Sequence, residues 1–227
     1  MSIELEFEMS SINLGTIQCR LANVATFTAC RLPRHGRYGS RVTIFPSRKN
    51  NAPLMCESLL EAAFCLELER RADVLCYQIH PYTLTFVAAK VRYTPDFQVT
   101  FASGSQQLIE VKNDQSFECK RIRARLSRII ELLAEHDCLL ECLPMHHFYD
   151  ATRTSNLEYL YHLAYSNNGG ADSAIHRYLA QQPQAIPLRQ LMRKTFGPTD
   201  IAHALFYKVI NCNIRRPITE ESMVWLN

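Results

Sequence analysis

Residues 93–112, YTPDFQVTFASGSQQLIEVK, hold the pattern that decides the fold of this chain. Two apolar runs, Phe97–Phe101 and Leu108–Val111, are separated by Ser103-Gly104-Ser105, which is typical of a hairpin turn. The pattern predicts two antiparallel strands, and a further β-like run lies upstream at Thr83–Ala89.

The same stretch contains three side chains that are suited to metal binding and catalysis. Glu110 and Lys112 are two residues apart, so on a strand they share one face, while Val111 points into the core. In a hairpin, Asp96 lies near the end of the second strand that carries Glu110 and Lys112. Two carboxylates can hold Mg²⁺ or Mn²⁺, which activates water, and a lysine can stabilise the developing charge. The set predicts phosphodiester hydrolysis, with solvated charges on an edge strand as the alternative.

The flanking segments predict a mixed α/β sandwich. A helical pattern from Cys56 to about Arg71 comes first. After the hairpin follow a basic helix, about Glu118–Glu135, a strand, Leu139–Leu143, and a helix, about Ser155–Ser166. The order of helix, three strands, helix and strand is typical of a sheet covered by helices.

The first helix adds a third carboxylate to the site. Glu57 and Glu61 are four residues apart, so they are expected on one helix face, and either can reach a metal. A glutamate at the start of a helix is also explained by the helix dipole, and this explanation fits Glu57 better than Glu61.

Basic residues gather in two places, although the formal net charge is only +3. Residues 1–53 read as short strands and turns, and no Asp or Glu occurs between Met9 and Cys56. The second cluster lies on the basic helix. Such stretches suit a polyanion such as DNA, although a solvated basic face explains each alone equally well. The DNA contacts that we predict are Arg34, Arg37, Arg41, Lys49, Lys120, Arg121 and Arg125.

The C-terminal part reads as a separate module after the linker-like Asn167-Asn168-Gly169-Gly170. Three helices and a two-stranded ribbon are expected, which is the layout of a winged helix, and Thr199 is the expected N-cap of the third helix. That helix is largely apolar, so protein docking is favoured over DNA reading, with accessory contacts from Arg215 and Arg216. The expected helices are Ala174–Gln181, Leu188–Thr195 and Asp200–Cys212.

Nine scattered cysteines without a C-x-x-C pair indicate a reducing compartment. Cys138 and Cys142 with His146 and His147 can be drawn as a zinc site, but their spacing matches zinc sites poorly. Residues 1–9 carry three glutamates and no apolar run, and no apolar stretch reaches the length of a membrane span. A cytoplasmic protein is expected.

These motifs, in their order and spacing, resemble the TnsA family, the end-cutting endonucleases of heteromeric cut-and-paste transposons, including elements that have captured CRISPR systems. The resemblance runs from about Val42 to Asn113, with a looser extension to Asn227. The matching segments are Phe45-Pro46-Ser47, Glu57-Ser58-Leu59-Leu60-Glu61, Asp73-Val74-Leu75, His80-Pro81, Tyr93-Thr94-Pro95-Asp96-Phe97 and Ile109-Glu110-Val111-Lys112.

The resemblance implies an α/β, restriction-endonuclease-like domain of the PD-(D/E)XK type over residues 1–168, with a mixed sheet flanked by helices. A small winged-helix-like domain over residues 171–227 follows it. The implied catalytic residues are Glu61, Asp96, Glu110 and Lys112. We expect one or two Mg²⁺ or Mn²⁺ ions on Glu61, Asp96, Glu110 and the Val111 carbonyl. Relatives often have glutamine-proline where this chain has His80-Pro81, and a hydrogen-bonded structural histidine is the alternative for His80.

The resemblance also implies partners. A TnsA-type enzyme cuts the 5′ ends of the element on the non-transferred strands of double-stranded DNA. A TnsB-like transposase cuts and joins the 3′ ends, and a TnsC-like AAA+ ATPase regulates the complex. The alternatives are a stand-alone restriction or repair nuclease of the same fold and a catalytically inactive DNA-binding adaptor.

Overall fold

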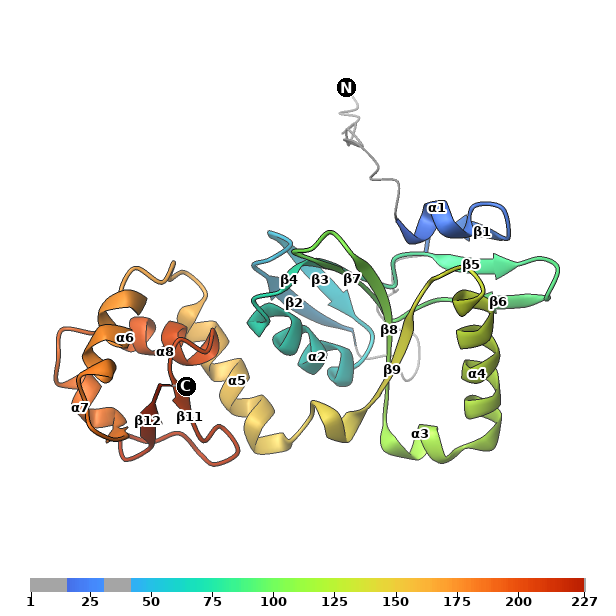
Figure 1. The fold of residues 1–227 in the computed structure, drawn as a ribbon. Helices are drawn as coiled ribbons and strands as arrows, with labels where there is room; N and C mark the ends of the chain where they lie inside the picture. Colours follow the sequence, from blue (N-terminus) through green and yellow to red (C-terminus); the bar gives the residue numbers. More distant parts are fainter. Residues whose placement is uncertain (1–15, 31–41, 227) are drawn as a thin grey trace, which may run out of the picture.

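The computed structural model describes residues 16–30 and 42–226 of the chain. Over these residues the protein is a mixed α/β protein with eight α-helices, one mixed four-stranded sheet and three smaller sheets (Figure 1). The predicted DNA contacts Arg34, Arg37 and Arg41 lie outside the described residues.

The four-stranded sheet is built on the predicted hairpin. Its strands pair antiparallel except for β8 and β9, which are parallel. The hairpin register sets Phe97 opposite Ile109, and Gly104 takes the turn position with φ +82°. A left-handed backbone of this kind favours glycine. In spatial order the strands are β4 (Val74–Ile79), β7 (Phe97–Phe101), β8 (Gln106–Lys112) and β9 (Leu140–Pro144).

One expected strand belongs to a different sheet. The Thr83–Ala89 run forms β5 (Thr83–Phe86), which pairs with β1 (Ala25–Thr28) and β6 (Val91–Tyr93). Strand β4 forms one edge of the main sheet, and its pairing with β7 shifts register between Val74 and Cys76. Because that irregularity breaks the simple alternation of apolar and polar residues, the segment gave no clear strand pattern.

The two faces of the main sheet bury different side chains. Ile109 and Val111 pack in a cluster with α2 (Leu59–Arg70) and α5 (Ala151–Ala164). Leu108 points to the opposite face, as strand periodicity requires. There it packs with α1 (Ile17–Leu21), the β1-β5-β6 sheet and α4 (Lys120–Ala134). The short helix α3 (Asp114–Glu118) joins β8 to α4.

Helix α2 begins later than expected. Its N-cap is Ser58, whose side chain accepts a hydrogen bond from the Glu61 amide. Glu57 therefore precedes the helix, and the expectation that Glu57 and Glu61 share a helix face is wrong. A serine followed three residues later by a glutamate is the capping-box signature, which sets the start of the helix after Ser58.

The C-terminal module contains three helices in the expected order, but its small sheet has three strands rather than two. The third helix ends at Phe206 rather than Cys212, and Asn211–Cys212 forms a strand instead. The N-cap of α8 is Gly197 rather than Thr199, because Pro198 takes the first helical position, which has no need of an N–H. The elements are α6 (Asp172–Ala180), β10 (Ile186–Pro187), α7 (Leu188–Met192), α8 (Pro198–Phe206), β11 (Asn211–Cys212) and β12 (Met223–Trp225).

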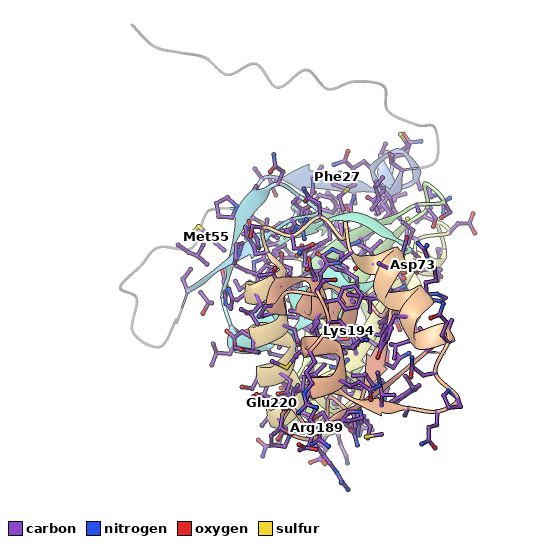
Figure 2. All side chains as sticks on the ribbon, turned by 90° about the vertical axis from the view of Figure 1, so that its left-hand side faces the viewer. Phe27, Met55, Asp73, Arg189, Lys194 and Glu220 are labelled. Atoms are coloured by element: carbon purple, nitrogen blue, oxygen red, sulfur yellow. The ribbon has the colours of Figure 1, made fainter. Side chains whose placement is uncertain are left out.

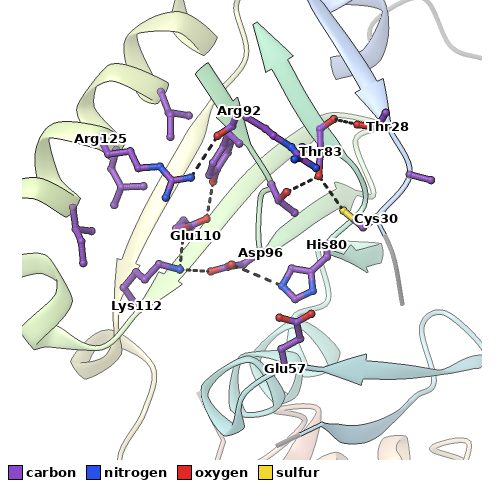
Figure 3. A pocket seen from close by; sticks show the side chains of 16 residues that line it. Thr28, Cys30, Glu57, His80, Thr83, Arg92, Asp96, Glu110, Lys112 and Arg125 are labelled. Carbon is purple, nitrogen blue, oxygen red and sulfur yellow. Dashed lines mark hydrogen bonds and ion pairs between the residues drawn. The ribbon is translucent and has the colours of Figure 1, made fainter. Parts of the chain in front are cut away.

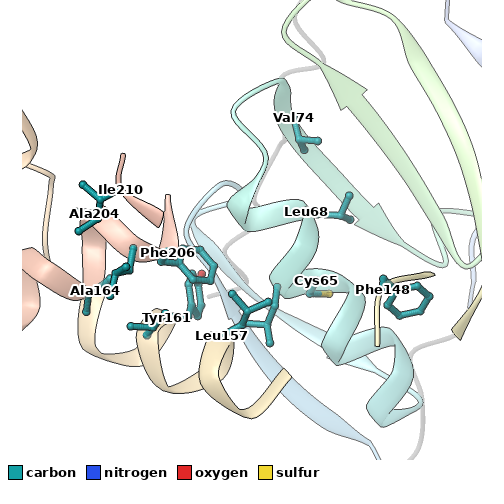
Figure 4. Close-up of a cluster of buried hydrophobic side chains, with 14 of the residues drawn as sticks. Cys65, Leu68, Val74, Phe148, Leu157, Tyr161, Ala164, Ala204, Phe206 and Ile210 are labelled. Atoms are coloured by element: carbon teal, nitrogen blue, oxygen red, sulfur yellow. The ribbon is translucent and has the colours of Figure 1, made fainter. Parts of the chain in front are cut away.

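One hydrophobic cluster joins the C-terminal module to the main sheet. Helix α5 lies between α2 and α8, and the rings of Tyr161 and Phe206 are 5.0 Å apart (Figure 4). The Arg70 Nε donates to the Phe206 carbonyl at 2.8 Å. A hairpin of β2 (Thr43–Ser47) and β3 (Ala52–Cys56) adds to this side, and Tyr161 donates to its Pro46 carbonyl at 2.7 Å. Among the described residues, no helix is both long and apolar enough to cross a bilayer.

Candidate active site

Asp96, Glu110 and Lys112 meet at one end of the β7–β8 hairpin (Figure 3). The Lys112 Nζ lies 3.1 Å from Asp96 Oδ2 and 2.7 Å from Glu110 Oε1. The Val111 amide also donates to Asp96 Oδ2, at 2.9 Å. The structure thus brings together these three predicted site residues. Val111 contacts the site through its N–H, and a metal ligand at its carbonyl stays a prediction.

Two buried carboxyl groups face a single ammonium in this cluster. Asp96 is 9% exposed and Glu110 is 5% exposed. Burial raises the pKa of both carboxyl groups, and the two carboxylates repel each other. For Lys112, burial lowers the pKa, but the adjacent Asp96 and Glu110 carboxylates outweigh it, so its pKa is raised. One ammonium faces two carboxylates, and this imbalance favours a further cation.

Tyr93 is a site residue to which the sequence analysis gave no role. Its hydroxyl donates to Glu110 Oε2 at 2.7 Å, and its ring is buried. Burial, with the nearby Glu110 carboxylate, raises the Tyr93 pKa well above its usual range. The hydroxyl therefore stays protonated and orients Glu110. Because β6 had not been predicted as a strand, nothing in the sequence placed Tyr93 opposite Glu110.

Glu61 is buried and takes part in capping its own helix. Its Oε2 accepts from the Glu57 amide at 2.8 Å, and its Oε1 accepts from the Ser58 hydroxyl at 2.9 Å. Oε2 also lies 3.8 Å from His80 Nε2. Glu57 is exposed and lines the cavity beside the site. Both glutamates therefore remain candidate metal ligands. Of the two, Glu61 has the carboxylate that hydrogen bonds hold in one orientation.

His80 lies between two of the predicted ligands. Its Nε2 is 3.8 Å from Glu61 Oε2 and 3.9 Å from Asp96 Oδ1. Its amide donates to the Asp96 carbonyl at 2.9 Å, which fixes the end of β4 against the start of β7. The sequence singled out this position only as a departure from the TnsA pattern.

A cavity of about 1240 Å³ opens beside the carboxylates. This volume exceeds the range of roughly 300–1,000 Å³ that is usual for small-molecule pockets, so it suits a segment of a polymer. Arg125 on α4 lines it, and its Nη2 donates to the Arg92 carbonyl at 3.4 Å. Other lining residues lie in or just beyond the strands β1, β5 and β6, and on α4: Thr28, Cys30, Thr83, Arg92, Tyr93, Thr94, Ile122, Leu126 and Ile129.

The remaining predicted DNA contacts fall in different surroundings. Lys120 and Arg121 are exposed on α4, and Arg121 lies one turn before Arg125 on the same flank. The Lys49 ammonium instead donates to the carbonyls of Arg71 and Val74 within the fold. Burial lowers the pKa of Lys49. Lys49 is therefore a structural side chain in this arrangement.

Arg215 and Arg216, the predicted partner contacts, are exposed between β11 and β12. They lie on the C-terminal module, whereas the carboxylate site lies at the β7–β8 hairpin. Any role for these two arginines is therefore separate from the chemistry at the hairpin.

The donor set suits a hard divalent cation. Across residues 16–30 and 42–226, no three His, Cys, Asp or Glu side chains already surround one point in the manner of a metal cage. However, Asp96 and Glu110 both present oxygens to the single ammonium of Lys112. Carboxylate oxygens are the ligands that Mg²⁺ and Mn²⁺ take. A divalent ion bound there would use Asp96 and Glu110, with Glu61 nearby.

No protein-family model matches this sequence, and no curated protein matches it either.

Proposed function

We propose that this chain is a metal-dependent DNA endonuclease. The observation that carries the proposal is the convergence of Asp96, Glu110 and Lys112 at the edge of a large cavity with arginines on its wall. The order α2-β4-β7-β8-α4-β9, with β9 parallel to β8, supports a restriction-endonuclease-like fold of the PD-(D/E)XK type.

Each residue has a role in this proposal. Asp96 and Glu110 hold the divalent ion, and Tyr93 and the Val111 amide keep the two carboxylates oriented. When bound, the metal polarises the phosphate and lowers the pKa of a coordinated water. Lys112 positions that water and stabilises the charge that develops on the phosphate.

The DNA backbone follows the flank of α4 in the proposed complex. Arg92 and Arg125 contact phosphates beside the scissile bond, and Arg121 extends the track along the helix. Such contacts set the register of the DNA but read no sequence. Choice of the cleavage site therefore belongs to a partner.

More specifically, we propose a TnsA-type role, in which the chain cuts the 5′, non-transferred strands at transposon ends. A TnsB-like transposase cuts and joins the 3′ ends, and a TnsC-like AAA+ ATPase regulates the assembly. The order of the sequence motifs around the site supports this role. The paired PD and E-x-K elements meet in space as that family requires.

The winged-helix-like C-terminal module is proposed to dock a protein. The six residues from Ile201 to Phe206 are all buried, so α8 cannot present a recognition face to a DNA groove. Figure 2 looks onto this module, where exposed charges of both signs, such as Lys194 and Glu220, stand on the surface. A mixed-charge surface suits a protein partner better than a polyanion.

The decisive experiment reconstitutes the chain with a TnsB-like transposase and a TnsC-like AAA+ ATPase, which the proposal expects among its neighbouring genes. Transposon-end DNA, Mg²⁺ and the three proteins should give 5′-strand cuts that the chain with Asp96→Ala does not give. Site-specific cutting of naked DNA by the purified chain alone would favour a stand-alone nuclease. DNA binding without any metal-dependent cleavage, alone or in the assembly, would favour an inactive adaptor.

A further inference from the structure

His80 has a backbone conformation that its sequence disfavours. Its φ is +44°, in the left-handed region that non-glycine residues rarely adopt. The following residue is Pro81, which restricts the residue before it to extended conformations. Residues held in such conformations cluster at functional sites, where surrounding contacts enforce them. The bond from the His80 amide to the Asp96 carbonyl is one such contact.

The imidazole faces two carboxylates at distances that do not suit hydrogen bonds. Its Nε2 is 3.8 Å from Glu61 Oε2 and 3.9 Å from Asp96 Oδ1, beyond the usual limit for a hydrogen bond. Two ligands held about 2.1 Å from one octahedral ion lie about 3.0 Å apart when adjacent and about 4.2 Å apart when opposite. Both separations exceed the adjacent value by less than about 1 Å, so small side-chain rotations would let one ion contact the imidazole and each carboxylate.

We propose that His80 is a metal ligand, which adds an imidazole nitrogen to the carboxylate oxygens of Asp96 and Glu61. The inference rests on the proposed function, because it deepens the same metal site. The ring is 17% exposed and lines the cavity, so an ion can reach it. His80 stands where the TnsA pattern often has glutamine, so the nitrogen ligand is a property of this chain.

A nitrogen ligand changes which metal the site selects. Mg²⁺ prefers oxygen ligands and keeps its waters, whereas imidazole favours first-row transition metals. The site should therefore bind Mn²⁺ more tightly than Mg²⁺. The difference between the Mn²⁺ and Mg²⁺ affinities should depend on His80.

The test measures metal binding directly, on untagged full-length chain without DNA. His80→Gly removes the ligand yet tolerates the left-handed backbone, so the fold should survive. Lys90→Gly is the matched control, because Lys90 has φ +53° in an exposed turn away from the carboxylates. Titration calorimetry with Mn²⁺ and Mg²⁺ gives the two affinities. Electron spin echo modulation of bound Mn²⁺ reports coupling to ¹⁴N.

We expect ¹⁴N coupling in the wild-type chain and in Lys90→Gly, and its loss in His80→Gly. The Mn²⁺ affinity of His80→Gly should fall at least about tenfold, with a smaller change for Mg²⁺. Bound Mn²⁺ without ¹⁴N coupling in the wild type, or equal Mn²⁺ affinity in His80→Gly, would overturn the inference. Metal-dependent cleavage that requires Asp96 would then still uphold the proposed function. A wild-type chain that neither binds Mn²⁺ nor cleaves transposon-end DNA in the complete assembly would overturn both.

Discussion

Asp96 joins the hairpin to the proposed reaction centre through its two oxygens. The Val111 amide and Lys112 both donate to Oδ2, and Oδ1 faces His80 at 3.9 Å. These contacts keep a buried carboxylate at the edge of the cavity in one orientation. The burial that raises its pKa also makes a divalent cation a favourable partner.

The first prediction concerns Asp96→Ala. Because it removes a ligand at the end of a strand, cleavage by the complete assembly in Mg²⁺ should be lost while the fold persists. In thermal melts, Mn²⁺ should raise the midpoint of the wild type, since a ligand that binds only the native state stabilises it. The midpoint of Asp96→Ala should not respond. Wild-type cleavage by this variant would refute the site assignment.

Lys112→Ala separates metal binding from catalysis. The ammonium acts on water and phosphate, so its removal should lower the cleavage rate by about 10²–10³. Metal binding should persist, because Asp96 and Glu110 lose the cation that competes for their oxygens. Single-turnover cleavage together with Mn²⁺ titration measures the two effects. A variant that binds metal and cuts at near-normal speed would show that Lys112 is only a strand-edge charge.

Glu61 and Glu57 can be distinguished by matched substitutions. Glu61→Gln keeps a carbonyl oxygen that can accept from the Glu57 amide, so the helix cap largely survives, but it loses the anionic ligand. Cleavage should stop. Glu57→Gln should cost little, because Glu57 is exposed and precedes the helix. Cleavage assays on both variants, with melts as the fold control, test this, and the reverse pattern would move the ligand to Glu57.

At the scale of elements, α4 has one flank that faces the core and another that faces the proposed DNA track. Leu126, Ile129 and Leu133 are buried against the sheet. Arg121 and Arg125 are one turn apart on the neighbouring flank, and Arg125 lines the cavity. The helix thus places basic residues that are close in the sequence along one flank, next to the cavity.

Arg121→Ala with Arg125→Ala should weaken DNA binding in a salt-dependent way. Each lost phosphate contact should reduce the slope of log affinity against log salt by about 0.9. Arg123→Ala is the control, because Arg123 is two residues from both arginines and so points to the other side of the helix. Gel shifts at several salt concentrations measure the slopes. Equal slopes for the double variant and the control would remove α4 from the DNA interface.

At the scale of the whole molecule, the linker-like segment after α5 does not separate two cores. A single hydrophobic cluster runs from the main sheet through α5 to the C-terminal helices. Arg48 reinforces the junction by donating to the Ala164 carbonyl at 3.2 Å and to Asn168 Oδ1 at 3.1 Å. Deletion from Ala171 onward would expose the face of α5 that packs on α8. Surface substitutions therefore test docking more cleanly than truncation.

Arg215→Glu with Arg216→Glu should weaken association with the AAA+ ATPase and leave the melting midpoint unchanged, since both side chains are exposed. Lys194→Glu is the control on the same module, where Lys194 is exposed just after α7 and its ammonium lies over the Tyr178 ring. A pull-down against the ATPase measures association, and a gel shift with transposon-end DNA runs beside it. Unchanged ATPase binding with a loss of salt-sensitive DNA affinity would make the module a DNA reader.

The sequence by itself determined the hairpin and the convergence of Asp96, Glu110 and Lys112. Strand periodicity and a glycine turn act over a few residues, so the face that each side chain takes can be predicted locally. The longer helices of both parts were predictable from their local apolar spacing, with errors at their ends, where caps such as Ser58 and Gly197 decide the boundary. Two five-residue helices were missed: α1 lies in residues that were read as strands and turns, and α3 had not been predicted.

Only the tertiary structure decided which strands share the main sheet and which side chains complete the site. Val74–Ile79 becomes one edge strand, the Tyr93 hydroxyl donates to Glu110, and His80 lies between Glu61 and Asp96. These contacts join residues that are distant in the sequence, so no local pattern encodes them. Lys49 shows how a local pattern can mislead. Its basic neighbours predicted a DNA contact, but in the folded chain its ammonium donates to backbone carbonyls. Burial and pairing depend on what the rest of the chain places beside a residue, and that is settled only when the core forms.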